Sequence, residues 1–225
     1  MFLSYWLLDF LALLGLSTLA ATMVVWFYWM RRRVLKLIKK VVDDLEGFFK
    51  PIDKTYTLLG YLVGFRAIYE LERGDRLFIV LTTTPRHSLI YYPLLKLLGR
   101  TDRLQLALKP SSRYVLRELH VVDVRDKRSL QILARDLGER VNQLSRVEHE
   151  TPKGAYLVYY ESPEDLDLVK RVIERSPVHI YKLSAYTREN IVEVVADISS
   201  GDATAVARVL RDFSGKITRT RATSR

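Results

Sequence analysis

The stretch TTTPRHS, residues 82–88, holds the side chains best suited to chemistry. It follows an apolar run and enters a segment with helical features, so Thr84 is placed to cap a helix that has proline next to the cap. Free N–H groups at a helix start, together with a guanidinium, would bind a phosphate or a lipid headgroup. The predicted anion-binding residues are Thr84, Arg86, His87 and Ser88. The simpler interpretation, a capped turn whose arginine faces solvent, is the one that the sequence favours.

No other motif indicates catalysis. The sequence lacks the phosphate-binding loops GxxxxGK[ST] and GxGxxG, the GxSxG nucleophile elbow and the HExxH zinc motif. It has no cysteine, and its four histidines are isolated from one another. Asp165 and Asp167 resemble a carboxylate pair for a divalent metal, but they fall in the first turn of a predicted helix, where acids favour the helix dipole. We therefore predict no catalytic residue, no metal site and no cofactor, and the sequence leans toward a protein that is not an enzyme.

The chain has an apolar segment near its N-terminus that is long enough to span a membrane. From Phe10 to Met30 the chain carries no formal charge over twenty-one residues, and a helix of that length spans the roughly 30 Å hydrocarbon core of a bilayer. Aromatic residues gather at its end, in the sequence WFYW (26–29), and such rings prefer the headgroup level. Three arginines follow at once. The predicted membrane-interface residues are Trp26, Tyr28, Trp29, Arg31, Arg32, Arg33, Lys36, Lys39 and Lys40.

The position of these cations predicts the orientation of the chain. The segment before the apolar run has only Asp9, so the positive-inside rule puts the N-terminus outside and the rest of the chain in the cytoplasm. A cleaved signal peptide would need cations before the apolar run and a small-residue cleavage site after it. A buried helix of a soluble protein would be shorter and would lack the abrupt basic flank. We therefore expect a single-pass protein of the cell membrane.

The net charge of +10 is concentrated in two short segments. Residues 31–50 hold seven cations and three anions, and residues 216–225 hold four cations and no anion. Residues 51–215 are nearly neutral, with 25 cations against 22 anions. The expected partners of the basic segments are therefore anionic lipid headgroups, whereas nucleic acid is an unlikely partner.

Residues 31–50 have the pattern of an amphipathic helix, with apolar residues at alternating spacings of four and three. This helix can continue the membrane span, lie in the interface, dock on its own body or pair with a second copy. Docking or interfacial placement is favoured, because two heptads are few for a coiled coil. Self-association stays open, also through small residues four apart in the span, such as Ser17 with Ala21.

The remainder of the chain predicts an α+β body with a mixed sheet. In residues 51–125, period-two alternation predicts strands at 61–71 and 104–108. The turns at Arg73-Gly74-Asp75 and at 109–112 predict two further strands after them, at 77–81 and 119–124. A helical segment at 85–98 is expected to break at Pro93.

The second part of the body, residues 126–215, predicts more helix. A helix is expected from 126 to 144, then a βαβ unit with parallel strands at 155–160 and 178–183, and then two helices at 191–198 and 206–213. The predicted divisions are a membrane anchor (1–30), a basic amphipathic helix (31–50), an antiparallel part (51–125), a helix plus βαβαα part (126–215) and a basic disordered tail (216–225).

Three stretches carry a resemblance to known proteins. PIDKTYTLLGYLVGFRAIYELE (51–72), PRHSLIYYPLLKL (85–97) and TDRLQLAL (101–108) resemble a family of uncharacterised archaeal proteins that open with one membrane span. The resemblance covers about the first 125 residues and implies an archaeal source and the same topology. It implies no activity and no active site.

Three functions are compatible with this sequence. The first is a membrane-tethered binding or scaffold protein that holds a protein partner at the cytoplasmic face, since the chain has an anchor and a neutral body but no catalytic set. The second is a membrane-bound enzyme acting on a phosphorylated or lipid-linked substrate, with Arg86 and His87 at its anion site. The third is a tether to a ribosome or a nucleic acid through the basic tail, which only four cations support.

Overall fold

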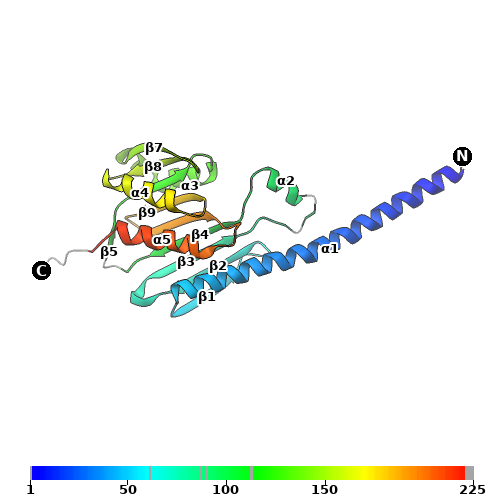
Figure 1. The fold of residues 1–225 in the computed structure, drawn as a ribbon, viewed down its shortest axis with the longest axis horizontal. Helices are drawn as coiled ribbons and strands as arrows, with labels where there is room; N and C mark the ends of the chain where they lie inside the picture. Colours follow the sequence, from blue (N-terminus) through cyan, green and yellow to red (C-terminus); the bar gives the residue numbers. More distant parts are fainter. Residues whose placement is uncertain (1, 61, 87, 90, 112–113, 221–225) are drawn as a thin grey trace.

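The computed structural model describes residues 2–60, 62–86, 88–89, 91–111 and 114–220. A single long helix, α1 (Phe2–Phe49), projects from an α+β body (Figure 1). Its 48 residues correspond to a rod of about 72 Å at 1.5 Å per residue. The N-terminal half of the rod extends away from the body, and the C-terminal half lies along it. The predicted membrane anchor and the predicted amphipathic helix are therefore one uninterrupted helix.

The body is built on a nine-stranded sheet in which every neighbouring pair is antiparallel. The strand order is β1-β2-β3-β4-β10-β9-β6-β8-β7. The strands are β1 (Asp53–Leu58), β2 (Gly64–Glu70), β3 (Arg76–Thr82), β4 (Arg103–Lys109), β6 (Leu119–Asp123), β7 (Ser145–Thr151), β8 (Gly154–Tyr160), β9 (Ile180–Tyr186) and β10 (Ile191–Asp197). Two short strands, β5 (Tyr114–Leu116) and β11 (Thr218–Thr220), pair separately.

Helices cover the two faces of the sheet unequally. The remaining helical elements are α2 (Tyr91–Leu97), α3 (Lys127–Leu137), α4 (Glu164–Arg175), α5 (Ala203–Ile217) and the 3₁₀ turns η1 (Glu72–Gly74) and η2 (Gly138–Gln143). Helices α1, α4 and α5 share one hydrophobic core with the sheet, to which α1 contributes Val41 and Leu45. On the opposite face, α3 packs Leu133 and Leu137 against Val122 of β6 in a separate small cluster. Burial of these apolar surfaces is the main force that holds the layers together.

Helix α5 shows why this segment of the chain is helical. Its buried residues recur at helical spacing along the face that meets the sheet and α1. Asp202 precedes the helix and accepts a hydrogen bond from the Ala205 N–H at 3.0 Å, which satisfies one of the free donors of the first turn. The hydrogen bond from Ala205 lowers the pKa of Asp202. The helix lies beside the docked half of α1, where Arg211 stacks over the Phe48 ring at 4.7 Å.

The first hairpins follow the predicted alternation. Phe65, Ala67 and Tyr69 are buried on one face of β2, and η1 forms the predicted turn into β3. Gly64 begins β2 at φ +141°, and a Cβ there would lie 1.8 Å from the Leu81 carbonyl oxygen. Only glycine allows β2 and β3 to approach so closely at that position.

Four predictions about the body are wrong. The segment 191–198 contains strand β10 rather than a helix, because it pairs with β4 on one side and β9 on the other, and its apolar residues stand on both faces, which weakens the period-two signal. The predicted helix at 126–144 ends at Leu137 and is followed by η2 and β7. Pro93 does not break α2, since it is the third residue of the helix and its missing N–H is not needed there. Strand β1 was not predicted at all.

The fourth wrong prediction is the mixed sheet. Strands β8 and β9 run in the same direction on either side of α4, as the βαβ pattern indicates, but they are not neighbours. Strand β6 lies between them and pairs with both in antiparallel fashion. The sequence pattern predicts that β8 and β9 run in the same direction. It does not indicate that β6 lies between them.

The sheet joins strands from both predicted parts of the body. Strand β10, from the later part, pairs with β4, and β9 pairs with β6. At the C-terminal end, α5 and β11 continue to Thr220, into the segment predicted as a disordered tail, and residues 221–225 lie outside the described residues.

Candidate functional site

The residues predicted to cross a membrane lie on the projecting part of α1. All residues from 6 to 25 are exposed, on every side of the helix. By its length and composition, this apolar stretch could cross a bilayer. The hydroxyls within it are satisfied by the helix itself, since Ser17, Thr18 and Thr22 each bond a carbonyl four residues earlier at 2.8 Å. The hydroxyls at these three positions therefore all have a hydrogen-bond partner within the helix.

The predicted interface residues follow along the same helix. Arg33 stacks over the Trp29 ring at 3.6 Å, and Met30 and Val34 are already buried against the body. Thus the helix passes from full exposure to burial within about two turns. Trp26 and Arg31 are half-buried, whereas Tyr28, Trp29, Arg32, Arg33, Lys36, Lys39 and Lys40 are exposed.

The predicted anion site is occupied by a carboxylate of the chain itself. Arg86 forms an ion pair with Asp102, which is completely buried, and the Thr84 N–H donates to the other oxygen of that carboxylate at 2.7 Å. Ser88 instead accepts a hydrogen bond from the Tyr91 N–H and so caps α2. His87 lies outside the described residues. The backbone and guanidinium donors converge as predicted, and binding of an external anion there stays a prediction.

The same segment is attached to α1. The indole N–H of Trp26 donates to the Arg86 carbonyl oxygen at 3.1 Å, and the Trp26 and Tyr92 rings lie 6.3 Å apart. The loop before α2 therefore touches the long helix at the position of the predicted aromatic belt.

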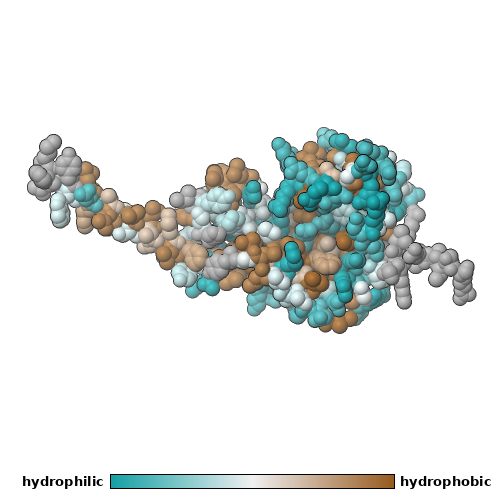
Figure 2. All heavy atoms as spheres, turned by 180° about the vertical axis from the view of Figure 1, so that it is seen from behind, coloured by the Kyte–Doolittle hydropathy of each residue, from teal (hydrophilic) through white to brown (hydrophobic). Residues whose placement is uncertain are grey.

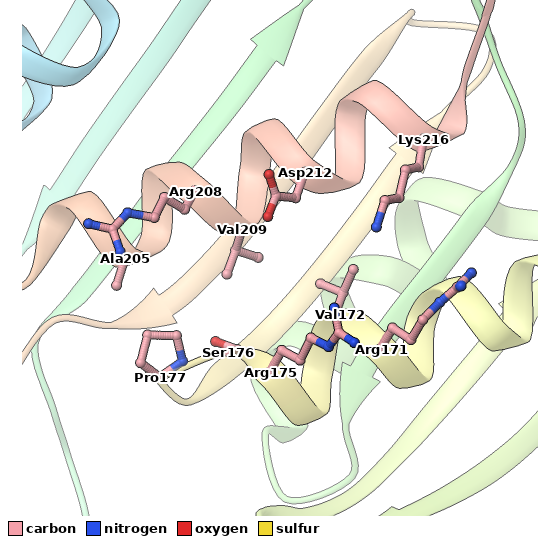
Figure 3. A pocket seen from close by; sticks show the side chains of 10 residues that line it. All are labelled: Arg171, Val172, Arg175, Ser176, Pro177, Ala205, Arg208, Val209, Asp212 and Lys216. Carbon is pink, nitrogen blue, oxygen red and sulfur yellow. The ribbon is translucent and has the colours of Figure 1, made fainter.

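A positively charged groove lies between α4 and α5. It has a volume of about 290 Å³, and Figure 3 shows side chains from both helices around it. Val172 and Val209 form part of its apolar floor. Its charged lining consists of Arg171, Arg175, Arg208 and Lys216 with Asp212. Four cations and one carboxylate leave the groove net positive, which would favour an anionic ligand such as a phosphate group.

A buried charge network crosses the sheet on the face opposite α5. Lys182 of β9 forms an ion pair with Glu193 of β10 at 2.7 Å, and Gln105 of β4 donates to the same carboxylate at 2.5 Å. Burial acts to lower the pKa of Lys182, but the charge of Glu193 outweighs it, so that the pKa is raised and the ammonium form is retained. A charged, fully paired lysine is suited to structural support rather than to proton transfer near neutral pH.

A second network joins the β5–β6 connection to η2. Glu118 lies 3.1 Å from the His120 ring nitrogen and accepts a hydrogen bond from the Thr187 N–H at 2.9 Å. Arg140 of η2 approaches the same carboxylate at 3.4 Å. Burial acts to raise the pKa of Glu118, but the hydrogen bonds from His120 and Thr187 lower it to about 2. Burial also lowers the pKa of His120, which favours the neutral ring.

One of the two aspartates noted in the sequence and one further histidine are also engaged in pairs. Asp165 is buried and lies 2.8 Å from Arg117, in agreement with its structural interpretation. His179 lies 2.7 Å from Asp123. Within the described residues, no group of three or more metal-binding side chains comes together.

The face of β2–β4 that points away from α1 is only partly buried. Cross-strand register places Ile68, Phe78 and Ala107 in one row and Val80, Gln105 and Val195 in the next. All six are half-buried, whereas their neighbours on the opposite face are buried. We call these six residues the open sheet face.

Comparison of the sequence with protein-family models and with curated proteins finds no match. The resemblance to archaeal membrane-anchored proteins therefore stays a prediction, and the function of these surfaces rests on their own residues.

Sequence reasoning missed the groove and the charge networks. A signal was present for the groove and for the Lys182–Glu193 pair. Arg171 and Arg175 are four apart on α4, a spacing that places two cations on one helix face. Glu193 interrupts the apolar run of β10, and Lys182 interrupts that of β9, and charges inside apolar strands usually indicate a buried pair. The pairing itself depends on the strand order, which the sequence does not reveal.

Proposed function

We propose that this protein is a non-catalytic scaffold, anchored in the cell membrane by α1, that holds a protein partner on its cytoplasmic body. One observation carries the proposal: α1 is at once a fully exposed apolar rod over residues 6–25 and a core helix of the body through Val41 and Leu45. Cleavage after the apolar rod would have to cut a continuous helix next to Met30 and Val34, which are buried in the body. The arrangement therefore favours a retained anchor over a transient leader.

The contacts of the docked half of α1 make the anchor rigid. Glu46 accepts hydrogen bonds from Tyr56 at 2.5 Å and from Lys54 at 2.6 Å, and Tyr56 also meets the Tyr69 hydroxyl at 2.6 Å. These contacts tie the helix to β1 and β2. A body fixed in this way would present the same surfaces to the cytoplasm at all times, as a scaffold requires.

The open sheet face is the surface that we assign to a protein partner. A solvated face of an antiparallel sheet is normally polar, but this one has apolar side chains in adjoining register rows, among them Phe78 and Val80. Adjoining apolar side chains that stay partly accessible support an interaction surface. The buried Lys182–Glu193 pair beside the patch would keep the strands in fixed register beneath a partner.

Photo-crosslinking in membranes tests the proposal. A crosslinking amino acid at Phe78, irradiated in native membranes that are only afterwards washed with alkaline carbonate to retain spanning proteins, should give a discrete adduct with a second protein. The substitution Val80→Glu should weaken that adduct, because it places a charge in the next register row. The same crosslinker at Lys170, exposed on α4, is the matched control and should not give the adduct. No adduct at Phe78, or an equal one at Lys170, would refute the partner surface, and loss of the chain in the carbonate wash would refute the anchor.

A further inference from the structure

Helix α2 exposes leucines that no described element covers. The exposed fractions are 86% for Leu97, 67% for Leu98 and 51% for Leu94, while Leu95, between them, is only 3% exposed. The buried Leu95 holds the helix on the body and leaves the other three leucines pointing outward. Exposed leucines packed this densely in one short helix are unusual on a protein surface surrounded by water.

The contact with Trp26 determines where this helix lies along α1. The Trp26 indole bonds the Arg86 carbonyl, and the Trp26 ring meets Tyr92 in the first turn of α2. Trp26 belongs to the aromatic cluster at the end of the apolar rod, where such rings occupy the headgroup level of a bilayer. The exposed leucines of α2 are thereby held near the level at which the membrane interface begins.

The tip of the β1–β2 hairpin adds apolar surface at the same end of the sheet. Leu58 is 75% exposed at the end of β1. The hairpin tip is attached to the loop that leads into α2, because the Thr83 N–H donates to the Val63 carbonyl at 2.7 Å and the Thr83 hydroxyl to the Leu62 carbonyl at 2.8 Å. The hairpin tip and the start of the loop that leads to α2 therefore lie at the same end of the sheet.

Figure 2 shows hydrophobic side chains continuing from the rod of α1 onto the adjacent end of the body. In Figure 1 this end carries α2, beside the point where α1 leaves the body. Lys96 and Arg100 are exposed next to the leucines. A short helix with outward leucines and flanking cations has the chemistry of an interfacial membrane element, whose cations meet anionic headgroups.

We propose that α2 and the β1–β2 tip form a second membrane-contacting surface, whose occupant is the lipid bilayer interface next to α1. This inference rests on the proposed membrane anchoring of α1. A soluble partner on the same leucines would have to sit within the headgroup layer, because the surface is continuous with the apolar rod. Two attachment points, one spanning and one interfacial, would fix the tilt of the sheet on the membrane.

Because the chain has no cysteine, single cysteines can report the depth of each position. Full-length variants Leu97→Cys, Val25→Cys and Val147→Cys, each carrying an environment-sensitive fluorophore, are reconstituted into vesicles of neutral and anionic phospholipids at high lipid-to-protein ratio. The vesicles contain lipids with bromine on the acyl chains, which quench a fluorophore in contact with them. Val25 lies in the apolar rod, and Val147 is an exposed apolar residue of β7, at the other edge of the sheet.

The label at position 97 should be quenched at least two-fold more strongly than the label at 147, and the label at 25 should be quenched most. Quenching at 25 but not at 97 would overturn the second contact and leave the anchor intact. Quenching at neither position would overturn the anchor as well. A blue-shifted but unquenched label at 97 would show that a second copy of the chain covers the leucines, which also overturns the inference.

Discussion

At the scale of single residues, the stability of the body depends on buried charges that are paired across the fold. Glu118 joins His120, Thr187 and Arg140, three groups from different segments of the chain. Removing one member of such a network leaves the others buried without a partner, which costs more than the net value of the bonds.

The variant Glu118→Gln should be less stable at neutral pH and less sensitive to acid. The native pKa of Glu118 is about 2, against an ordinary value of 4.5. Its contribution, roughly 3 kcal/mol at 1.36 kcal/mol per pKa unit, is therefore present above pH 4.5 and is lost as the pH falls toward 2. Urea unfolding of the full chain in non-ionic detergent at pH 7, 4.5 and 3 measures the difference. Glu148→Gln, at an exposed position on β7, is the control and should follow the parent protein at every pH.

The Arg86 segment shows how far residue types alone can predict a site. Its converging donors were predictable, because they depend on neighbours in sequence, whereas the predicted cap was wrong, since α2 begins at Tyr91 and is capped by Ser88 rather than by Thr84. The carboxylate of Asp102 that meets them was not, since it comes from the segment between α2 and β4 and is brought there by the pairing of β3 with β4. Partners distant in sequence are the part of a site that local patterns cannot supply.

At the scale of elements, α1 is the part of the structure best predicted from sequence and β10 the worst. The apolar positions of residues 31–50 recur at helical spacing, and Val34, Val41 and Leu45 are indeed buried. Strand β10 is apolar on both faces, so its residues fit a helix equally well. The half-buried strands β2 and β4 alternate clearly and were predicted. The difference between an apolar and a more polar side therefore made β2 and β4 predictable, whereas β10 lacks this difference.

The packing of α1 can be tested within a single helix. Leu45→Ala should lower the free energy of unfolding by about 2–5 kcal/mol, because the side chain is fully buried and its removal leaves a cavity in the core. Leu35→Ala, at an exposed position ten residues earlier, should change it by less than about 0.5 kcal/mol. Urea unfolding of both full-length variants in the same detergent makes the comparison. Equal, small effects would mean that the second half of α1 does not dock on the body.

At the scale of the whole molecule, charge and hydropathy are distributed along one axis. The apolar rod lies at one end, an exposed cationic segment follows where the rod meets the body, and the body itself is nearly neutral. A membrane-tethered protein gains from this order, since the cations lie next to the headgroups while the rest of the surface is not drawn onto the lipid. If the apolar rod spans a membrane, the docked half of α1 would fix the orientation of the sheet relative to that span.

The same axis predicts the topology of the chain. The exposed cations Arg32, Arg33, Lys36, Lys39 and Lys40 all follow the apolar segment, so the positive-inside rule places residues 31–225 in the cytoplasm. Protease added to sealed vesicles with the cytoplasmic side inward should therefore leave a fragment of nearly full length, shortened at most by the residues before the span. The same protease after addition of detergent is the control and should digest the exposed loops of the body. Digestion of the body in intact vesicles would reverse the orientation, and it would place the open sheet face outside the cell, where a cytoplasmic partner cannot reach it.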